Sequence, residues 1–341
     1  MSSPAETRDA GQTSASGCDG STAVIVVNWN AGETLLDCLA ALERQTVTVS
    51  RTIVVDNGST DGSIAAARAR FPHIEVMMLG RNTGFAHANN VALEHTDGVR
   101  WVALLNPDAR PEPRWLEELL RAAAVHAGYA FFASRLLSGI DPELLDGAGD
   151  SYHMAGLPGR AGHGLPAAGR FTATREVFSA CAAAALYRRD ILLEAGGFDD
   201  RFFCYLEDVD LGFRLRLRGH RCLYVPGAVV HHLGSRSSGR GSDFYVYHGQ
   251  RNLVWTFLRN MPGVWLWVLL LPHLALNLFA LCHFTFRGQG SVAWRAKRDA
   301  LVAVPELLRD RRIIQASRRV RSWHVVRHMT LGWPGRRPLR G

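Results

Sequence analysis

The sequence predicts an α/β fold, a Rossmann-like and mostly parallel sheet flanked by helices, followed by a hydrophobic helical appendage. Between residues 23 and 124, short apolar runs rich in Val and Ile alternate with stretches whose apolar residues recur at helical spacing. The runs are continuous, which is typical of parallel strands covered on both faces. A chain of 341 residues with 47% hydrophobic content can bury one large domain and still carry an appendage.

The expected elements follow from these patterns. Strands are expected at residues 23–28, 52–56, 74–78 and 101–105, each followed by a helix, at 33–45, 62–69, 85–95 and 114–124. Further on we expect a short helix at 188–195, a helix over about 206–217 that ends at Gly219, and a strand at 222–230. Residues 138–170 contain eight glycines and three prolines, so we expect a long, mobile loop there.

Polar residues gather where the early strands end. In a parallel sheet these ends meet at one edge, and open α/β sheets bind their ligands at that edge. Asn and Asp also form ordinary turns, so each cluster alone has a structural interpretation. Three clusters, each at the end of a strand, favour a shared binding site. They are Asn28 with Asn30, Asp56 with Asn57, and Asn106 with Asp108.

The expected ligand of this edge is a nucleotide held through a cation. Neither GxGxxG nor GxxxxGK[ST] follows the first strand, so a dinucleotide fold or a P-loop is poorly supported. Asp108 can bind a hard divalent metal, Mg²⁺ or Mn²⁺, that bridges two phosphates. His231 and His232 follow the strand at 222–230 and would face Asp108 across one pocket. For these histidines, metal ligation and an ordinary structural role are both open.

A second concentration of chemistry lies at residues 196–221, GGFDDRFFCYLEDVDLGFRLRLRGHR. Glu207, Asp208 and Asp210 fall in the first turn of the expected helix, where backbone N–H groups and the helix dipole favour negative charge. These acids can therefore simply cap the helix, with Asp210 in an i,i+4 ion pair. The aromatic approach at residues 202–205 would instead desolvate them and make one a general base. The residues alone leave both interpretations open.

Six motifs, in a fixed order, carry a resemblance to a known family. They are VVNWN, VVDNGSTDGS, RNTGFAHANN, LLNPDA, FSACAAAALYRRDILLEAGGFDDRFFCYLEDVDLGFRLRLRGH and VVHHLGS. From about residue 22 to 260 the chain resembles the family 2 inverting glycosyltransferases of GT-A fold, especially the bacterial rhamnosyltransferase-like branch that builds cell-envelope glycans. Each motif is weak alone, and their order and spacing make the resemblance specific.

The resemblance implies roles for individual residues on the nucleotide side. Asp56 would hydrogen-bond the nucleobase, with Asn28 and Asn30 lining that pocket. Four residues would belong to the segment that packs around the nucleotide, namely Asn82, Gly84, Phe85 and Asn90.

The resemblance also implies a metal site and a base. Asn106-Pro107-Asp108 takes the place of the family's Asp-x-Asp motif, which leaves Asp108 as the sole firm acidic metal ligand. His231 matches the metal-ligand histidine of the family, and His232 is the less favoured alternative. Asp208 matches the catalytic base, with Glu207 beside it in the substrate site.

The implied activity is transfer of a sugar, with rhamnose the best match, from a nucleotide-diphosphate sugar such as dTDP-rhamnose to a hydroxyl of a cell-envelope glycan or lipid-linked acceptor. Such a reaction needs one carboxylate as base and one cation at the departing diphosphate. Two alternatives are a nucleotidyltransferase of related fold and a non-catalytic, membrane-bound nucleotide-sugar-binding protein. The former should carry a Gly-rich basic loop where this chain has NWNAGET, and the latter would not need Asp108 and Asp208.

The chain is expected to have three parts. Residues 1–20, rich in Ser, Thr and Gly without an apolar run, would be a disordered lead lacking a secretory signal. Residues 21–260 would form the glycosyltransferase domain, and 261–341 a hydrophobic membrane-associated segment with a basic tail. The six cysteines form no CxxC pair, so reduced, cytosolic thiols are expected.

Residues 264–286, VWLWVLLLPHLALNLFALCHFTF, contain no Asp, Glu, Lys or Arg. They are long enough to span a bilayer, but one crossing would put the 14 Lys and Arg of residues 287–341, set against three acids, on the outer side. Pro272, His273 and Asn277 also interrupt the middle. We therefore expect an in-plane or re-entrant anchor on the cytoplasmic face of the cell membrane, with the tail on anionic lipid and not on nucleic acid. A helix hairpin packed on the catalytic domain is the alternative.

Overall fold

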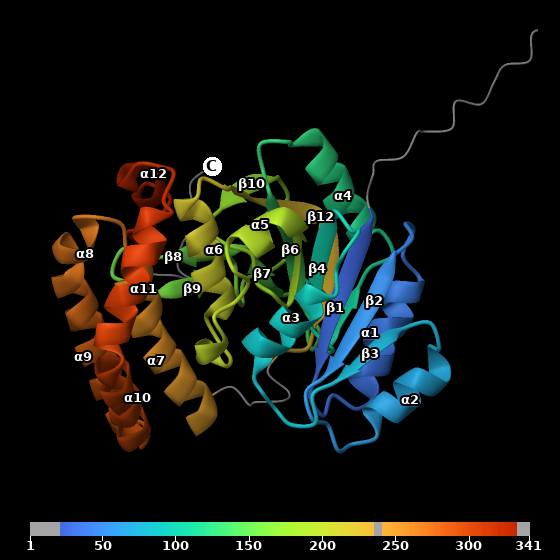
Figure 1. Cartoon of the computed structure of the whole chain (residues 1–341), viewed down its shortest axis with the longest axis horizontal. Helices are drawn as coiled ribbons and strands as arrows, with labels where there is room; N and C mark the ends of the chain where they lie inside the picture. The colour runs from blue at the N-terminus through green and yellow to red at the C-terminus, as the bar shows by residue number, and fades with distance from the viewer. Residues whose placement is uncertain (1–20, 235–240, 333–341) are drawn as a thin grey trace, which may run out of the picture.

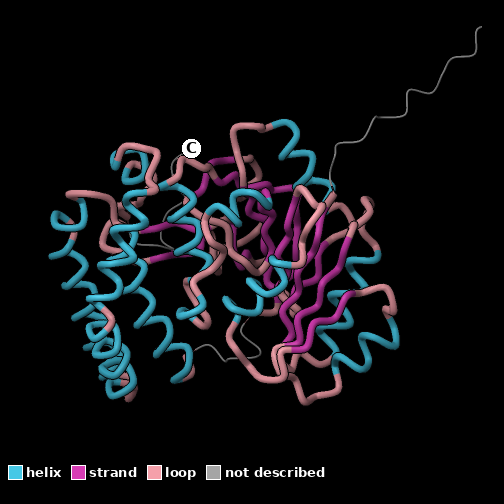
Figure 2. Tube along the Cα trace, viewed as in Figure 1, coloured by secondary structure: helices cyan, strands magenta, loops and turns pink. Residues whose placement is uncertain are grey.

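The molecule has two sides (Figures 1 and 2). A large sheet with helices on its faces makes one side, and the carboxyl-terminal helices, from α7 (Asp243–Asn260) to α12 (Ser322–Val326), stand together on the other. The structure is a computed structural model and describes residues 21–234 and 241–332. The expected disordered lead at 1–20 and the end of the basic tail lie outside the described residues.

The first half of the sheet has the predicted strand and helix pairs. They are β1 (Thr22–Asn28), α1 (Glu33–Glu43), β2 (Arg51–Asp56), α2 (Ser63–Arg70), β3 (Glu75–Met78), α3 (Phe85–Glu94), β4 (Trp101–Leu105) and α4 (Trp115–Val125). β1 runs parallel to both β2 and β4, and β2 runs parallel to β3. The carboxyl ends of these strands therefore meet at one edge, as the sequence predicts.

The second half of the sheet is mixed. Its strands are β5 (Ala109–Pro111), β6 (Phe131–Ser138), β7 (Leu145–Ala148), β10 (Arg175–Val177), β11 (Ala184–Arg188) and β12 (Cys222–His232), and the main order is β10-β12-β6-β11-β4-β1-β2-β3. β12 is parallel to β6, but β11 is antiparallel to both β4 and β6. Because Ala184 pairs with Leu105, the chain enters β11 at the carboxyl end of β4 and can only run back. The expectation of a mostly parallel sheet is wrong for this half.

The Gly-rich segment 138–170 contains strands where a mobile loop was expected. β7 pairs with β6, and β8 (Asp150–Tyr152) pairs with β9 (Pro158–Arg160) in a separate two-stranded sheet. The error has a local cause. These strands are three or four residues long, too short for a period-two pattern to stand out from the glycines.

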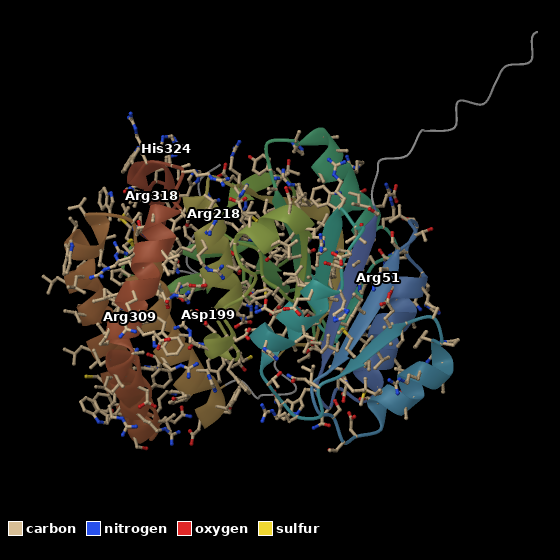
Figure 3. All side chains as sticks on the ribbon, viewed as in Figure 1. Arg51, Asp199, Arg218, Arg309, Arg318 and His324 are labelled. Atoms are coloured by element: carbon tan, nitrogen blue, oxygen red, sulfur yellow. The ribbon has the colours of Figure 1, made fainter. Side chains whose placement is uncertain are left out.

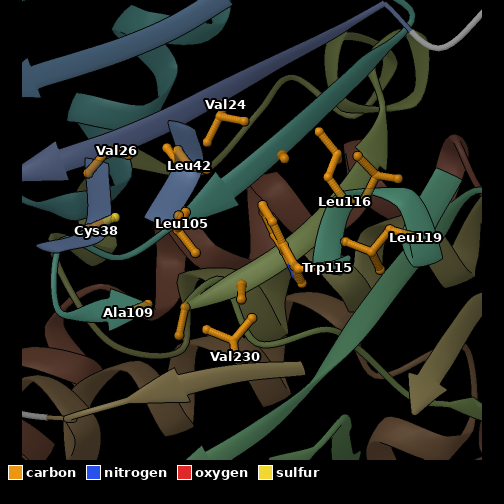
Figure 4. Packing of buried hydrophobic residues seen from close by; sticks show 14 of the residues in the cluster. Val24, Val26, Cys38, Leu42, Leu105, Ala109, Trp115, Leu116, Leu119 and Val230 are labelled. Carbon is orange, nitrogen blue, oxygen red and sulfur yellow. The ribbon is translucent and has the colours of Figure 1, made fainter. Parts of the chain in front are cut away.

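Apolar residues fill both faces of the sheet. Val24 and Val26 of β1 pack on one face with α1 and α4, where Trp115 is fully buried and donates from Nε1 to Ser134 Oγ at 2.8 Å (Figure 4). The alternate residue Ile25 packs on the other face, which is covered by α3, α5 (Arg189–Glu194) and α6 (Glu207–Leu217). Burial on both faces explains why β1 is apolar at every position from Ala23 to Val27.

The carboxyl-terminal helices form a layer on α6. Besides α7 and α12 they are α8 (Trp265–Val268), α9 (Leu270–Phe286), α10 (Gly290–Val302) and α11 (Val304–Ala316). α7 packs on α6, α10 and α11, and α9 packs on α10. Ion pairs join the layers. Asp199, which is labelled in Figure 3 and precedes the short 3-10 helix η1 (Asp200–Phe202), has its Oδ2 2.6 Å from Arg259 Nη1 of α7.

The hydrophobic segment 264–286 folds as α8 and α9 against this layer. Within the described residues, every helix is too short or too polar to be a candidate membrane span. The packed hairpin of α9 and α10 is the arrangement that the sequence left as the alternative to an anchor. Association with a membrane surface, like the domain boundary at residue 260, stays a prediction.

Candidate active site

A cavity of about 680 Å³ opens at the carboxyl edge of β1, β2 and β4 and extends to α7. Residues from distant parts of the sequence form its walls. From the sheet side these are Asn57, Asn82, Gly84, Phe85, Asn106 and Asp108; from the opposite side they include Asp150, Arg160, Cys181, Glu207, Asp208 and His232; and at the α7 end Phe203, Tyr205, Phe244, Tyr245 and Phe284. Six residues predicted from the strand ends and the 82–85 loop thus meet at one place, together with Glu207 and Asp208 from the start of α6.

Asn57 organises the donor-side wall. Its Nδ2 donates to Asn82 Oδ1 at 3.0 Å and to the Gly84 carbonyl oxygen at 3.2 Å, while its Oδ1 accepts from the Thr83 N–H at 2.8 Å. Gly84 has a φ of 90°, and a Cβ there would lie 2.6 Å from the carbonyl oxygen of Phe203. Only glycine permits this approach, which brings the loop before α3 against the turn before α6.

Asn28, Asn30 and Asp56 hold loops and do not line the cavity. Asn28 is fully buried and donates from Nδ2 to the hydroxyls of Ser59 and Ser63, both at 2.9 Å. Asp56 accepts the Ser59 N–H at 3.3 Å, and Asn30 Oδ1 accepts the N–H of Thr60 at 2.8 Å. These bonds fix the loop after β2 on the end of β1. Contact of the three side chains with a nucleobase stays a prediction.

Asn90 is likewise structural. Its side chain exchanges hydrogen bonds with the backbone of Phe198, each at 2.8 Å, and donates to Asp200 Oδ1 at 2.6 Å. It therefore ties α3 to the segment that leads into η1. The sequence placed Asn90 in the right neighbourhood of the fold, but the structure does not bring it to the cavity wall.

Asp108 and His232 face each other across the sheet edge. Asp108 Oδ1 lies 3.4 Å from His232 Nε2, and His232 Nδ1 lies 2.8 Å from Asp146 Oδ2. Burial alone would lower the pKa of His232, but the hydrogen bonds to Asp108 and Asp146 outweigh it and raise that pKa. Burial alone would raise the pKa of Asp108, but the hydrogen bond and the charge of His232 outweigh it and hold that pKa below its usual range. The Asp146 carboxylate orients the imidazole so that Nε2 points at Asp108, as the outer partner of a metal-binding histidine does.

The preference for His231 over His232 is corrected by this geometry. Successive side chains of a strand point to opposite faces, and His231 Nε2 lies 3.1 Å from Glu112 Oε1, away from Asp108. Across the described ranges, no cluster of three or more His, Cys, Asp or Glu side chains is arranged to hold a metal ion. The pair of Asp108 and His232 nevertheless has the donor chemistry for two positions on a divalent cation whose other positions a diphosphate and water would fill.

Asp208 is fixed at the start of α6. Its Oδ2 accepts the Ala182 N–H at 3.0 Å and its Oδ1 accepts its neighbour's N–H, from Val209, at 2.8 Å. Burial raises the pKa of Asp208, opposed by these N–H groups and by the Arg160 charge. The adjacent Glu207 is buried, and its Oε2 has no hydrogen-bond partner among the residues that the structure describes. Burial together with the Asp208 charge raises the pKa of Glu207 well above its usual value. Asp208 is therefore the more firmly oriented carboxylate of the two.

Asp210 has a structural role. It is fully buried, and its carboxylate accepts from Arg214 Nε and from Asn260 Nδ2, both at 2.7 Å. For this acid the ion-pair interpretation is confirmed. The three acids in the first turn of α6 thus divide between the cavity and the core.

A strained turn presents Glu207 and Asp208 to the cavity. Three residues of this turn that are not glycine have positive φ, at 65°, 70° and 66°: Phe203, Tyr205 and Leu206. Such conformations persist only where surrounding contacts enforce them. Asn252 of α7 supplies those contacts, because it is fully buried and its Nδ2 lies 2.7 to 3.0 Å from three carbonyl oxygens of residues 202–205. α7 therefore helps to position Glu207 and Asp208, although it lies far from them in the sequence. No local sequence pattern could have indicated this role.

Sequence reasoning also missed residues of the Gly-rich segment. Arg160 donates from Nη1 to Asp146 Oδ2 at 2.6 Å and from Nη2 to Cys181 Sγ at 3.1 Å. Asp150 lies close by and is buried, and burial together with the Asp208 charge raises its pKa well above the usual value. The only available signal was a few isolated charges, namely Asp146, Asp150 and Arg160, in a stretch otherwise rich in glycine.

Comparison with known proteins decides the family. The family model "Glycosyl transferase family 2" matches residues 23–196. The chain belongs to this family. The chain is also 32% identical over 272 residues to "N-acetylglucosaminyl-diphospho-decaprenol L-rhamnosyltransferase" of Mycobacterium tuberculosis (strain ATCC 25618 / H37Rv), an alignment that covers 71% of this chain and 85% of that protein. It is 26% identical to "O-antigen biosynthesis protein RfbC" of Myxococcus xanthus over 52% of this chain and 16% of that protein.

Solved structures agree on the fold of this glycosyltransferase. GalNAc-T7 with UDP, GalNAc and Mn²⁺ superposes with a TM-score of 0.57 and 15% identity over 70% of this chain and 48% of that chain. TarS of S. aureus superposes with a TM-score of 0.53 and 17% identity over 87% and 52%. The predicted family and enzyme class are confirmed, with a mixed α/β sheet of GT-A type. The nucleotidyltransferase and the non-catalytic binding protein are thereby set aside.

Proposed function

We propose that this glycosyltransferase moves rhamnose from a nucleotide-diphosphate sugar, with dTDP-rhamnose as the expected donor, to a hydroxyl of a lipid-linked glycan. One observation carries the proposal: a single cavity holds an oriented carboxylate, Asp208, together with the pair Asp108 and His232. The choice of sugar and of a lipid-linked acceptor is supported by the mycobacterial relative, which is named as a rhamnosyltransferase acting on N-acetylglucosaminyl-diphospho-decaprenol.

Asp208 is the proposed base. The acceptor hydroxyl attacks the anomeric carbon, its proton passes to the Asp208 carboxylate, and the bond from that carbon to the diphosphate oxygen breaks, which inverts the centre. The two backbone N–H bonds hold the carboxylate in one orientation, so attack and proton transfer can coincide. Because burial raises the pKa of Asp208, the ionised form is a stronger base than an exposed aspartate.

The donor occupies the sheet side of the cavity in this proposal. Asn57, Asn82 and Asn106 present amide groups toward the space between the strand ends. Asp108 and His232 would hold a divalent cation, Mg²⁺ or Mn²⁺, which when bound neutralises charge on the departing diphosphate. Asp146 keeps His232 in the orientation that this role needs.

The test is a donor screen with purified protein and a prenyl-diphospho-N-acetylglucosamine acceptor, read by mass spectrometry, with Asp208→Asn as the inactive control. We expect the acceptor to gain one deoxyhexose from dTDP-rhamnose, with the opposite anomeric configuration by NMR. Gain of a different sugar would contradict the choice of donor. Retention of configuration would contradict the single-displacement role of Asp208.

The proposed place of action is the cytoplasmic face of the cell membrane. A lipid-linked acceptor resides in a bilayer, whereas nucleotide sugars are cytosolic, so the enzyme must work where the two meet. The basic character of residues 287–341 supports an anionic lipid surface as that place.

A further inference from the structure

The outward side of α8 and α9 carries a continuous apolar stripe. Its members are Trp267, Leu271, Leu274, Leu278, Phe279 and Phe286, and we call this set the outer stripe. Their spacing places them on one side of the helices. Leu271 is 75% exposed and Phe286 is 91% exposed, so these are whole side chains in water and not edges of a core.

The stripe extends over the length of α9. α9 has 17 residues, which at 1.5 Å per residue extend about 26 Å. Only His273 and Leu276 of this helix are buried. Contiguous apolar patches of this size on soluble proteins mark interaction sites.

Two polar residues in the first half of α9, His273 and Asn277, make contacts with the rest of the protein. His273 stacks on Phe257 with ring centroids 3.8 Å apart, and its Nδ1 lies 2.8 Å from the Ala155 carbonyl oxygen. Asn277 accepts a hydrogen bond from Lys297 of α10. These two contacts tie the first half of α9 to the rest of the protein, so the helix can lie on a surface while the catalytic domain stays beside it.

The charges around the stripe identify its partner. No Asp, Glu, Lys or Arg occurs in residues 264–286, while exposed arginines follow on the neighbouring elements: Arg287, Arg295, Arg298, Arg309 and Arg312. Arg309 is labelled on α11 in Figure 3. An uncharged apolar face on a helical layer that also exposes these arginines complements a bilayer with anionic headgroups. A second copy of the chain would meet this surface with the same positive charge.

The stripe ends beside the aromatic end of the cavity. Phe284 lines the cavity, and Phe286, two residues later, is on the outside. Phe244 and Tyr245 of α7 line the same end and are also exposed, at 39% and 40%. An aromatic surface that passes from the cavity to the outside at the end of α9 suits an isoprenoid chain entering from lipid.

We propose that the outer stripe is a docking surface for an anionic phospholipid bilayer. The stripe lies in the plane of the interface and holds the aromatic end of the cavity at headgroup level, so that a lipid-linked acceptor reaches Asp208 without leaving the membrane. The docking itself needs no catalysis. The part that concerns the acceptor rests on the proposed function.

The first experiment measures binding of the full-length protein to vesicles by sedimentation, comparing phosphatidylglycerol/phosphatidylcholine mixtures with phosphatidylcholine alone. The stripe variant is Leu271→Gln/Leu274→Gln/Leu278→Gln. The matched control is Met78→Gln/Val125→Gln/Ile140→Gln, three exposed apolar residues outside the stripe. We expect the wild type and the control to bind the anionic vesicles and the stripe variant to bind at least tenfold more weakly.

Two results would overturn the proposal. One is equal binding by the stripe variant and the control. The other is a wild-type dimer in sedimentation velocity that the stripe variant converts to monomer while vesicle binding is absent, since the partner would then be a second copy. Donor binding and thermal melting of each variant establish that it is folded.

A second experiment separates docking from chemistry. Transfer is measured with an acceptor embedded in anionic vesicles and with a short-chain, water-soluble acceptor. We expect the stripe variant to lose at least tenfold in rate on the vesicle acceptor and to match the wild type on the soluble one. Equal loss on both acceptors would contradict a docking role, whereas failure of the wild type on both, with vesicle binding intact, would contradict only the proposed function.

Discussion

The two sides of the cavity are assembled from contacts of different range. On the sheet side, Asn28 bonds to Ser59 and Asn57 to Asn82, so each bond links a strand end to the next strand and helix unit. On the α7 side, Asn252 holds a turn about 50 residues earlier, and His273 of α9 reaches Ala155 across 118 residues. The sheet side of the cavity therefore depends on contacts between elements that are neighbours in the sequence. The α7 side forms only when helices distant in the sequence have packed together.

The largest expected effect tests the point where the two sides meet. Asp208→Asn keeps the size of the side chain but removes the base, and we expect the rate of transfer to fall on the order of 10²–10⁴-fold with donor affinity nearly unchanged. Steady-state kinetics and calorimetric donor binding measure both quantities. Glu207→Gln is the neighbouring control, and a larger loss in that variant than in Asp208→Asn would reassign the base.

A pair of adjacent histidines tests the sheet side. His232→Ala should lower donor affinity and rate together by roughly 10–100-fold, because it removes the side chain that faces Asp108. His231→Ala should change either quantity by less than about twofold, since it breaks only a contact with Glu112 at the opposite face. EDTA and Asp108→Ala should reproduce the His232→Ala loss. Full activity in chelator would exclude a metal role for this pair.

Asn252 tests the α7 side. Asn252→Ala removes the donor shared by three carbonyl oxygens, which we expect to cost about 1–3 kcal/mol of unfolding free energy and to lower kcat more than donor affinity. Asn252→Asp has nearly the same shape but cannot donate when ionised, so it should be at least as harmful. A mild effect of Asn252→Asp would show that packing, and not hydrogen bonding, holds the turn. Chemical denaturation and steady-state kinetics provide the readouts.

A smaller effect should appear in the pH profile. The ionised base is the active form, so the rate should rise with pH through the raised pKa of Asp208. The positive charge of Arg160 lowers that pKa, and Arg160→Met should therefore move the acidic limb of the kcat profile to higher pH. Arg160→Lys keeps the charge and should move it less. Identical profiles for the three proteins would contradict this electrostatic link between β9 and α6.

The last test concerns the stability of the helical layer and not catalysis. Burial lowers the pKa of Lys297 to about 7, from 10.5, so between those values the folded protein binds fewer protons than the unfolded chain. Stability should therefore rise with pH across this window, by at most about 1.4 kcal/mol per pH unit from this group. Lys297→Met should remove that contribution, as measured by denaturant unfolding from pH 7 to 10. An unchanged slope would mean that Lys297 is ionised in the fold.

The sequence could predict β1 to β4 and α1 to α4 because apolar runs alternate there with helices of at least eight residues, each bounded by turn residues, whereas the three-residue β5 was not predicted. It could also place Asn57, Asn106 and Asp108 near one another, since strand ends in a parallel sheet share an edge. It could not choose between His231 and His232. That choice depends on which face of β12 turns toward Asp108, and the register shift between Val225 and Val229 disturbs the alternation by which the face would be counted.

The residues that sequence reasoning missed share a physical cause. Asp146, Asp150 and Arg160 belong to very short strands whose positions follow from pairing with β6 and with each other. Asn252 lies in a helix with many polar residues, where nothing local marks it as the one turned toward the strained turn before α6. Such residues acquire their role through tertiary packing, and local sequence patterns do not indicate that role.

The chemical reactivity of Lys297 can report when α9 separates from the catalytic domain. It is the only lysine among 39 basic residues, and its ε-amino group is buried between α7 and α9 by bonds to the Gln250 carbonyl and to Asn277. An amine with a pKa of about 7 is roughly half neutral at pH 7 and is then a good nucleophile, yet an acylating reagent can reach this one only when the helices part. Apart from the amino terminus, Lys297 is thus the one amine that an acylating reagent can label. Its rate of acylation would measure how often α9 separates from the catalytic domain.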